Sequence, residues 1–254
     1  GDTSLLPDVR TRDLLPPGTL VAVCDGMGGA AAGDLASKLA LGALEQVVRA
    51  QGPIGSVDVA EATLLHAVTT ANRTILDFAK AHPDKRGMGT TMTAALLFGD
   101  EIVIVQVGDS RAYLKRGHTL QQLTMDQNVV GQMIATGRIS PDQARNVKQR
   151  NMLLEAIGVQ EKVGPDLVRV RVQPGDIMLL CSDGLTGPLD DPRVLEILLR
   201  HEDPVPSSRA LTEAACAAGG PDNVTVALVR FHGQTIAPVS TDATISFVRR
   251  TALA

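Results

Sequence analysis

The order of helical and strand-like segments constrains the fold of this 254-residue chain more than any other feature. Apolar residues recur at three- and four-residue steps over Gly33–Ala50 and again over Val57–Ala81, which predicts two long amphipathic helices. Two further helical segments are expected at Arg193–His201 and Ser207–Ala218. A βαβ repeat would alternate strands with helices, but here the helices come in pairs between β-rich blocks. The order therefore predicts an α+β fold, a four-layer α-β-β-α sandwich in which two antiparallel sheets have helices outside them.

Short apolar runs bounded by glycine and aspartate predict the strands of these sheets. We expect one domain over residues 1–232, with a polar surface insertion, the flap, at Asp126–Gly158. Residues 233–254 lack periodicity and are rich in Thr and Ser, so they are predicted to be a tail or linker. The expected strands are Leu20–Cys24, Thr90–Leu97, Glu101–Val107, Arg111–Lys115, Asp166–Val172, Ile177–Cys181 and Val224–Phe231.

Composition excludes some classes of partner. The chain has no Trp, one Tyr and a formal net charge of −4. Nucleic-acid readers are usually basic and stack bases on aromatic side chains, so nucleic acid is not an expected partner. No apolar run approaches the ~20 residues of a membrane helix. The three cysteines match no metal-ligand spacing and are expected to be reduced thiols, which favours a cytoplasmic protein.

Aspartates beside glycine are the most informative candidates for chemistry. Asp25-Gly26, Gly108-Asp109, Asp183-Gly184 and Pro221-Asp222-Asn223 each lie at the edge of an apolar, strand-like run. A carboxylate there stands on a rigid strand and projects into a loop, while glycine lets the backbone approach a bound ion. Hard divalent cations prefer such oxygen ligands. The alternative for any single pair is a plain hairpin turn, because Asp-Gly and Gly-Asp are common turn residues.

Other catalytic sets have less support in the residues. The five histidines are scattered, and none neighbours a candidate nucleophile, which argues against a Ser-His or Cys-His mechanism. Cys181 precedes Ser182-Asp183, but no basic residue flanks it to lower its thiol pKa, so a buried thiol is expected. The glycine-rich loop after Asp25 lacks the Gly-Lys-Ser/Thr of a P-loop.

Several motifs follow one another at characteristic spacings. They are Val23-Cys-Asp25-Gly-Met-Gly-Gly29, Gly33-x-x-Ala36-Ser37, Gly89-Thr-Thr-Met-Thr-Ala94, Val107-Gly-Asp109-Ser-Arg111-Ala-Tyr113, Pro174-Gly-Asp-x-x-Leu-Leu-Cys-Ser-Asp183-Gly-Leu185 and Pro221-Asp222-Asn223-Val-Thr-Val226. In this order they resemble the metal-dependent serine/threonine protein phosphatases of the PPM family, also called protein phosphatase type 2C, in their compact bacterial form. The resemblance runs from about Asp2 to Phe231.

The resemblance implies a site for two divalent cations, Mn²⁺ or Mg²⁺, with a third, weaker ion as in bacterial relatives. Asp25 would bridge two ions, and the carbonyl of Gly26 would bind the second. Asp183 and Asp222 would bind the first ion, so Asp25, Asp183 and Asp222 are the expected catalytic residues. A water shared by the two ions would attack phosphorus as hydroxide, and no covalent phospho-enzyme would form.

Two further metal ligands are carried over from the resemblance. Asp109 would join Asp183 at the third ion. Asp2, 23 positions before Asp25, suits the family's acidic residue near the second ion. Thr90 and Thr91 would be structural, beginning a core strand, and Asn223 would support the Asp222 loop.

Three departures from the family pattern affect what it implies. The opening Arg-x-x-Asn-x-Asp motif, whose Arg binds the substrate phosphate, is represented only by Gly1-Asp2. Met27 stands where some eukaryotic members carry a His proposed as general acid, so the leaving-group proton would come from metal-bound water. The flap segment Asp126-Gln-Asn128 lacks the His often found after that Asp.

Substrate class and partners follow from the resemblance. It implies phosphorylated proteins as substrates, a serine/threonine kinase as the opposing enzyme, and a monomer acting in signalling. A catalytically weak phosphoprotein-binding module is one alternative, but that module would have lost metal-ligand aspartates, and all four loop aspartates are present. The other alternative is a phosphatase of small phosphoesters, which the metal site itself does not distinguish.

Overall fold

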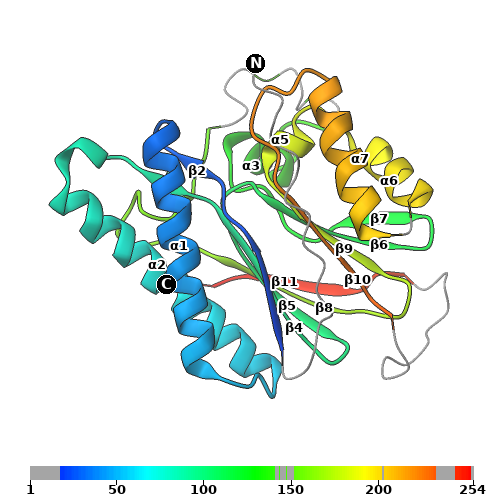
Figure 1. Ribbon diagram of the computed structural model, residues 1–254, viewed down its shortest axis with the longest axis horizontal. Helices are drawn as coiled ribbons and strands as arrows, with labels where there is room; N and C mark the ends of the chain where they lie inside the picture. The colour runs from blue at the N-terminus through cyan, green and yellow to red at the C-terminus, as the bar shows by residue number, and fades with distance from the viewer. Residues whose placement is uncertain are drawn as a thin grey trace.

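The computed structural model describes residues 18–140, 143, 147, 152–201, 203–232 and 244–252. Two antiparallel sheets pack against each other, with helices on their outer faces (Figure 1). The predicted α+β sandwich is therefore confirmed. The larger sheet has five strands in the order β1 (Thr19–Val23), β4 (Met92–Phe98), β5 (Glu101–Val107), β8 (Asp166–Arg171) and β11 (Phe247–Thr251). The smaller sheet has four strands in the order β10 (Val226–Arg230), β9 (Ile177–Cys181), β6 (Arg111–Arg116) and β7 (Thr119–Gln122).

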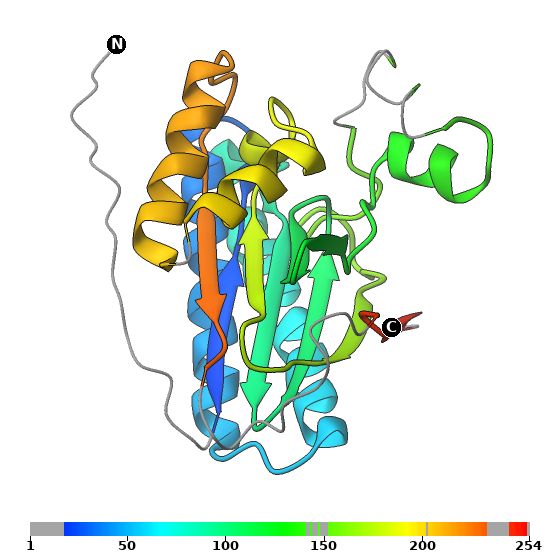
Figure 2. The ribbon, with the colours of Figure 1, turned by 90° about the vertical axis from the view of Figure 1, so that its right-hand side faces the viewer.

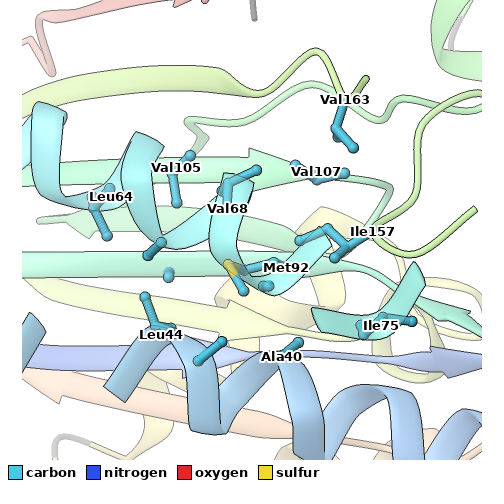
Figure 3. Close-up of a cluster of buried hydrophobic side chains, with 14 of the residues drawn as sticks. Ala40, Leu44, Leu64, Val68, Ile75, Met92, Val105, Val107, Ile157 and Val163 are labelled. Atoms are coloured by element: carbon cyan, nitrogen blue, oxygen red, sulfur yellow. The ribbon is translucent and has the colours of Figure 1, made fainter. Parts of the chain in front are cut away.

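Two long helices, α1 (Ala30–Gln51) and α2 (Val57–Ala81), cover the five-stranded sheet. Ser56 caps α2, because its Oγ accepts a hydrogen bond from the backbone N–H of Val59 (3.3 Å), an otherwise unpaired group of the first turn. The apolar stripe of each helix packs against the sheet, and Figure 3 shows this cluster. Its members include Ala40, Leu44, Leu64, Val68, Ile75, Met92, Val105, Val107 and Ile157.

The four-stranded sheet is covered by α6 (Asp191–Arg200) and α7 (Pro204–Ala217). Asp190 and Asp203 cap these helices, and each side chain accepts a hydrogen bond from a backbone N–H of the first turn. A second cluster fills the space between this sheet and its helices, and a third fills the space between the two sheets. The inter-sheet cluster includes Ala95, Ile104, Leu114, Val168, Met178 and Leu180.

Strand register brings the ends of β1 and β5 to the same edge of their sheet. Val23, the last residue of β1, lies opposite Thr93 of β4. Met92, which precedes Thr93, lies opposite Val107, the last residue of β5. Asp25 and Asp109 follow these strand ends by two residues each, so their loops are neighbours.

The short turn between β5 and β6 connects the two sheets, so β6 of the smaller sheet begins at the same end of the sandwich. Cys181, the last residue of β9, pairs with both Arg111 at the start of β6 and Val226 at the start of β10. Asp183 follows β9, and Asp222 precedes β10. The topology therefore gathers all four loop aspartates at one end of the sandwich.

The flap carries a short helix, α3 (Val129–Ala135), which stands away from the sandwich (Figure 2). Asn128 caps it by accepting a hydrogen bond from the N–H of Gly131 (2.8 Å). The structure does not describe residues 141–142, 144–146 and 148–151 of this segment. The described part of the flap therefore includes the helix α3.

The predicted tail or linker over residues 233–254 is wrong for Phe247–Thr251. These residues form β11, an edge strand antiparallel to β8. The carboxylate of Glu61 on α2 accepts hydrogen bonds from Arg169 of β8 and Arg250 of β11, so the added strand is held by charge as well as by its ladder. Residues 233–243 lie outside the described residues.

Within the described ranges, none of the helices is long and apolar enough to cross a membrane.

Candidate active site

Asp25 stands in the loop between β1 and the two-residue strand β2 (Gly26–Met27), which pairs with β3 (Gly89–Thr90). The backbone of Asp25 is fixed on both sides: the N–H of Thr91 donates to its carbonyl (2.8 Å), and its own N–H donates to Thr91 Oγ1 (2.9 Å). A Cβ on Gly26 would lie 2.0 Å from the carbonyl oxygen of Gly33. Only glycine therefore allows the first turn of α1 to approach this loop.

Asp109 lies in the turn between β5 and β6, after Gly108, whose φ is +99°. Its side chain is buried, and its Oδ2 accepts a hydrogen bond from Asn128 Nδ2 (3.1 Å). The same Asn128 caps the flap helix, so one side chain joins the Asp109 carboxylate to α3. This contact orients Asp109 and ties the flap to the site.

Asp183 begins the short helix α5 (Asp183–Thr186), directly after β9. A Cβ on Gly184 would lie 2.1 Å from the carbonyl oxygen of Asn223, and Ser182 Oγ donates to that same oxygen (3.2 Å). The backbone next to Asp183 is thus packed tightly against the loop that carries Asp222. The Asp222 side chain is exposed, and its Oδ1 accepts a hydrogen bond from the backbone N–H of Asn223 (2.8 Å).

The carboxylates raise one another's pKa. Burial raises the pKa of Asp25 to about 7, and the charges of Asp183 and Asp222 add to the shift. Burial, again the largest cause, raises the pKa of Asp109 to about 6, although its hydrogen bond from Asn128 opposes the shift. The pKa of Asp183 is raised by burial and by Asp222. The carboxylates repel one another when they are all ionised, and a bound divalent cation would offset that repulsion.

Unsatisfied hydrogen-bonding capacity also marks the site. Among the described residues, Asp183 Oδ1 is buried and accepts no hydrogen bond. A buried carboxylate oxygen without a partner costs free energy unless something positive satisfies it. At the same time, no group of three or more His, Cys, Asp or Glu side chains in the described ranges is close enough to form a complete metal cage. The described side chains alone therefore do not form a complete ligand set for a metal ion.

Sequence reasoning missed the role of Asp126 and Arg111. Asp126 opens the flap and lies close enough to Asp109 and Asp183 for its charge to raise their pKa values. Arg111 binds it through two hydrogen bonds, from Nε to Oδ1 (2.8 Å) and from a terminal nitrogen to Oδ2 (2.7 Å). The Gly-Asp-Ser-Arg motif contained Arg111, but only the fold shows that Asp126 is its partner.

Gln127 stands where the family pattern often has His, and the structure shows what it does. Its Oε1 accepts the N–H of Gly108 (2.9 Å), and its Nε2 donates to the carbonyl of Gly164 (3.0 Å). The side chain therefore braces the Asp109 turn from the flap side.

Of the predicted ligands, Asp25, Gly26, Asp109, Asp183 and Asp222 come together at one end of the sandwich, whereas Asp2 lies outside the described residues. Cys181, weighed as a nucleophile, is fully buried, and burial raises the pKa of its thiol to about 12. A thiol in that state is inert, so the interpretation as a structural cysteine is confirmed.

The fold and the acidic cluster define a class of metal-dependent hydrolases, and comparison with known proteins identifies the family. The family model for protein phosphatase 2C matches residues 12–218. The serine/threonine phosphatase stp of Listeria monocytogenes is 39% identical over 210 residues, which are 83% of each chain. The chain belongs to the protein phosphatase 2C family.

Solved structures agree with this membership. Serine/threonine phosphatase Stp1 from Staphylococcus aureus superposes with a TM-score of 0.80 at 34% identity and covers 84% of each chain. The catalytic domain of the phosphatase PstP, solved in complex with two manganese ions, superposes with a TM-score of 0.73 at 37% identity, covering 87% of this chain and 91% of that one. The predicted enzyme class, a metal-dependent serine/threonine protein phosphatase, is confirmed by these relatives.

Proposed function

We propose that this chain hydrolyses phosphoserine and phosphothreonine in proteins with two divalent cations, Mn²⁺ or Mg²⁺, held by Asp25, the carbonyl of Gly26, Asp183 and Asp222. Asp109, with Asp183, would hold a third and weaker ion. The observation that carries the proposal is that the strand order and register gather the four loop aspartates at one end of the sandwich, where their charges raise the pKa of Asp25. Four acidic loops from two sheets meet at one end of the fold, and stability alone does not require this.

The donor set suits hard cations. Every side chain offered is a carboxylate, and the glycine beside Asp25 brings a backbone carbonyl close, which are the ligand types that Mg²⁺ and Mn²⁺ prefer. A cation would offset the repulsion that raises the pKa of Asp25 and would satisfy the unpaired Oδ1 of Asp183. Cys24 precedes Asp25, but burial and the charge of Asp25 raise the pKa of its thiol to about 12, so it offers no thiolate to a softer metal.

In this proposal the chain's own residues bind the cations and hold one another in place, and none of them attacks phosphorus. Bound cations would supply activation of water and charge neutralisation at the phosphoryl oxygens. Burial and the charge of Asp183 raise the pKa of Asp25, so the metal-free protein favours a proton on Asp25. Arg111 holds Asp126 in an ion pair, and its positive charge opposes the effect of the Asp126 carboxylate on the pKa of Asp109.

We further propose that the chain acts as a monomer on phosphoproteins of the cytoplasm and opposes a serine/threonine kinase. The location, the substrate class and the catalytic role each have one supporting observation. Cys24, Cys181 and Cys216 are free thiols, as expected in a reducing compartment. The names of the relatives specify serine/threonine phosphatases. All four loop aspartates are present, which favours catalysis over a phosphoprotein-binding module.

Release of phosphate from a phosphothreonine peptide tests the proposal. We expect turnover with Mn²⁺ that EDTA abolishes, loss of turnover in Asp25→Ala, and a smaller loss in Asp109→Ala. Asp77→Ala, an exposed carboxylate on α2, is the matched control and should keep wild-type turnover. Metal-independent turnover, or full activity in Asp25→Ala, would contradict the proposal. Faster turnover of small phosphoesters than of peptides would replace the proposed substrate class.

A further inference from the structure

Thr91 connects two of the acidic loops through a single buried hydroxyl. It lies between β3 and β4 and is 3% exposed. Its Oγ1 accepts the backbone N–H of Asp25 (2.9 Å) and lies 2.7 Å from Ser110 Oγ, a contact in which either hydroxyl can donate. Ser110 directly follows Asp109 and is itself fully buried. One hydroxyl pair therefore spans the distance between the Asp25 loop and the Asp109 loop.

Further hydrogen bonds to backbone carbonyls fix each of the two loops next to this hydroxyl pair. Thr90 Oγ1 donates to the carbonyl of Asp25 (2.9 Å), next to the bond from the N–H of Thr91 to the same carbonyl. On the other loop, the carbonyl of Ser110 accepts hydrogen bonds from Thr93 Oγ1 (2.8 Å) and Gln106 Nε2 (3.2 Å). The contact is thus part of a buried polar network in which each member restricts the next.

The methyl group of Thr91 has a separate function. A Cβ on Gly108 would lie 2.7 Å from Thr91 Cγ2, so the methyl group packs directly against the glycine that precedes Asp109. Gly108 has a φ of +99°, a conformation that other residues rarely adopt. The methyl group therefore supports the turn by packing, whereas the hydroxyl joins the two loops by hydrogen bonds. The two contributions can be separated by substitution.

We infer that Thr91 is a positioning residue for metal binding, and that its hydroxyl, through Ser110, sets the relative placement of Asp25 and Asp109. This inference rests on the proposed function, because it takes Asp25 and Asp109 as ligands. Partners that orient the ligands of a metal site affect affinity although they never touch the ion. The role is more specific than the support of a core strand that the family resemblance implies for Thr91.

Mn²⁺ binding to the metal-free protein, measured by isothermal titration calorimetry, tests the inference. Thr91→Val keeps the methyl group and removes the hydroxyl, and we expect it to weaken Mn²⁺ binding about tenfold. Thr91→Ser keeps the hydroxyl and should retain nearly wild-type affinity. Ser110→Ala removes only the contact between the two hydroxyls and should weaken binding less than Thr91→Val does. The double variant Thr91→Val/Ser110→Ala should bind no more weakly than Thr91→Val, since that substitution already removes both contacts of the Thr91 hydroxyl.

Two controls separate this role from general destabilisation. Thr63 is a buried threonine on α2 whose hydroxyl donates to the carbonyl of Val59 (2.6 Å), so Thr63→Val removes a comparable bond away from the loops. It should leave Mn²⁺ affinity unchanged even if it lowers the melting temperature. Ser207→Ala on α7, which removes a hydroxyl bound to the carbonyl of His201 (2.8 Å), is the equivalent control for Ser110→Ala.

The outcomes distinguish this inference from the proposed function. If Asp25→Ala abolishes Mn²⁺ binding and both Thr91→Val and Ser110→Ala bind as tightly as wild type, the inference is wrong and the proposed ligands stand. It is also wrong if Thr91→Ser loses as much affinity as Thr91→Val, because packing would then account for the effect. If Asp25→Ala itself binds Mn²⁺ normally, the proposed ligand set fails first.

Discussion

Replacing Asp25 with Asn should stabilise the metal-free protein while destroying its function. Burial and the neighbouring carboxylates raise the pKa of Asp25 from its ordinary 3.8 to about 7. Each whole pKa step corresponds to about 1.4 kcal/mol, so the ionised side chain costs at most ~4 kcal/mol. Asp25 is half-buried, and solvent screening reduces this to about 2 kcal/mol. For a chain of this size, that is a rise in melting temperature of roughly 4–8 °C.

The sign of the pH dependence follows from the raised pKa. The folded protein holds the Asp25 proton more tightly than the unfolded chain, so its contribution to stability is complete below pH 3.8 and is lost as the pH rises towards about 7. The advantage of Asp25→Asn should therefore be large at pH 8 and less than half as large at pH 5. Both differences should shrink in high salt, which screens the repulsion between the partly exposed carboxylates of Asp25, Asp183 and Asp222.

Thermal unfolding in EDTA, followed by circular dichroism at pH 5 and pH 8, measures both effects. Asp77→Asn is the matched control, because Asp77 is exposed on α2, and its melting temperature should stay close to wild type at both pH values. With Mn²⁺ at a hundred times its dissociation constant, wild type should gain about 2.7 kcal/mol and Asp25→Asn should gain nothing. An Asp25→Asn melting temperature at or below wild type in EDTA at pH 8 would refute the electrostatic argument.

Two further predictions concern contacts outside the site. Asp176→Ala leaves Arg116 buried without the carboxylate it binds at 2.7 Å, and should lower the free energy of unfolding by roughly 3–5 kcal/mol in urea denaturation; a loss below 1 kcal/mol would mean that water reaches the pair. Glu61→Gln removes the partner of Arg169 and Arg250, and should speed hydrogen exchange in β11, whereas Asp58→Asn at an exposed carboxylate should not. Because Arg169 lowers the pKa of Glu61, the difference between wild type and Glu61→Gln should be present above pH 4.5 and fade as the pH falls through the lowered pKa; equal exchange in both variants at neutral pH would contradict it.

Helices and strands that are marked by the apolar periodicity of their own residues were predictable from the sequence. The helix at Val57–Ala81 and the strands at Glu101–Val107 and Ile177–Cys181 agree with the predicted ends, because their apolar periodicity stops at a capping or turn residue. Asp25 and Asp183 were identifiable because each is an aspartate beside glycine at the end of an apolar run.

Elements that depend on distant partners were not predictable. The strand β7 is mostly polar, Thr-Leu-Gln-Gln, and is a strand because it pairs with β6 at an edge of the sheet. The strand β11 depends on β8 and Glu61, which lie far away in the sequence. For the same reason Asp126 was not recognised as part of the site, since only folding brings it to Arg111 and close to Asp109.

The central claim is that Asp25, the carbonyl of Gly26, Asp183 and Asp222 hold the cations that drive hydrolysis. A crystal structure of the full chain grown with Mn²⁺, with anomalous diffraction measured at the manganese edge, tests this directly. We predict anomalous peaks within coordination distance of these four groups, with Asp25 contacting two ions. Ions bound elsewhere, or none at this end of the sandwich in an active preparation, would contradict the account.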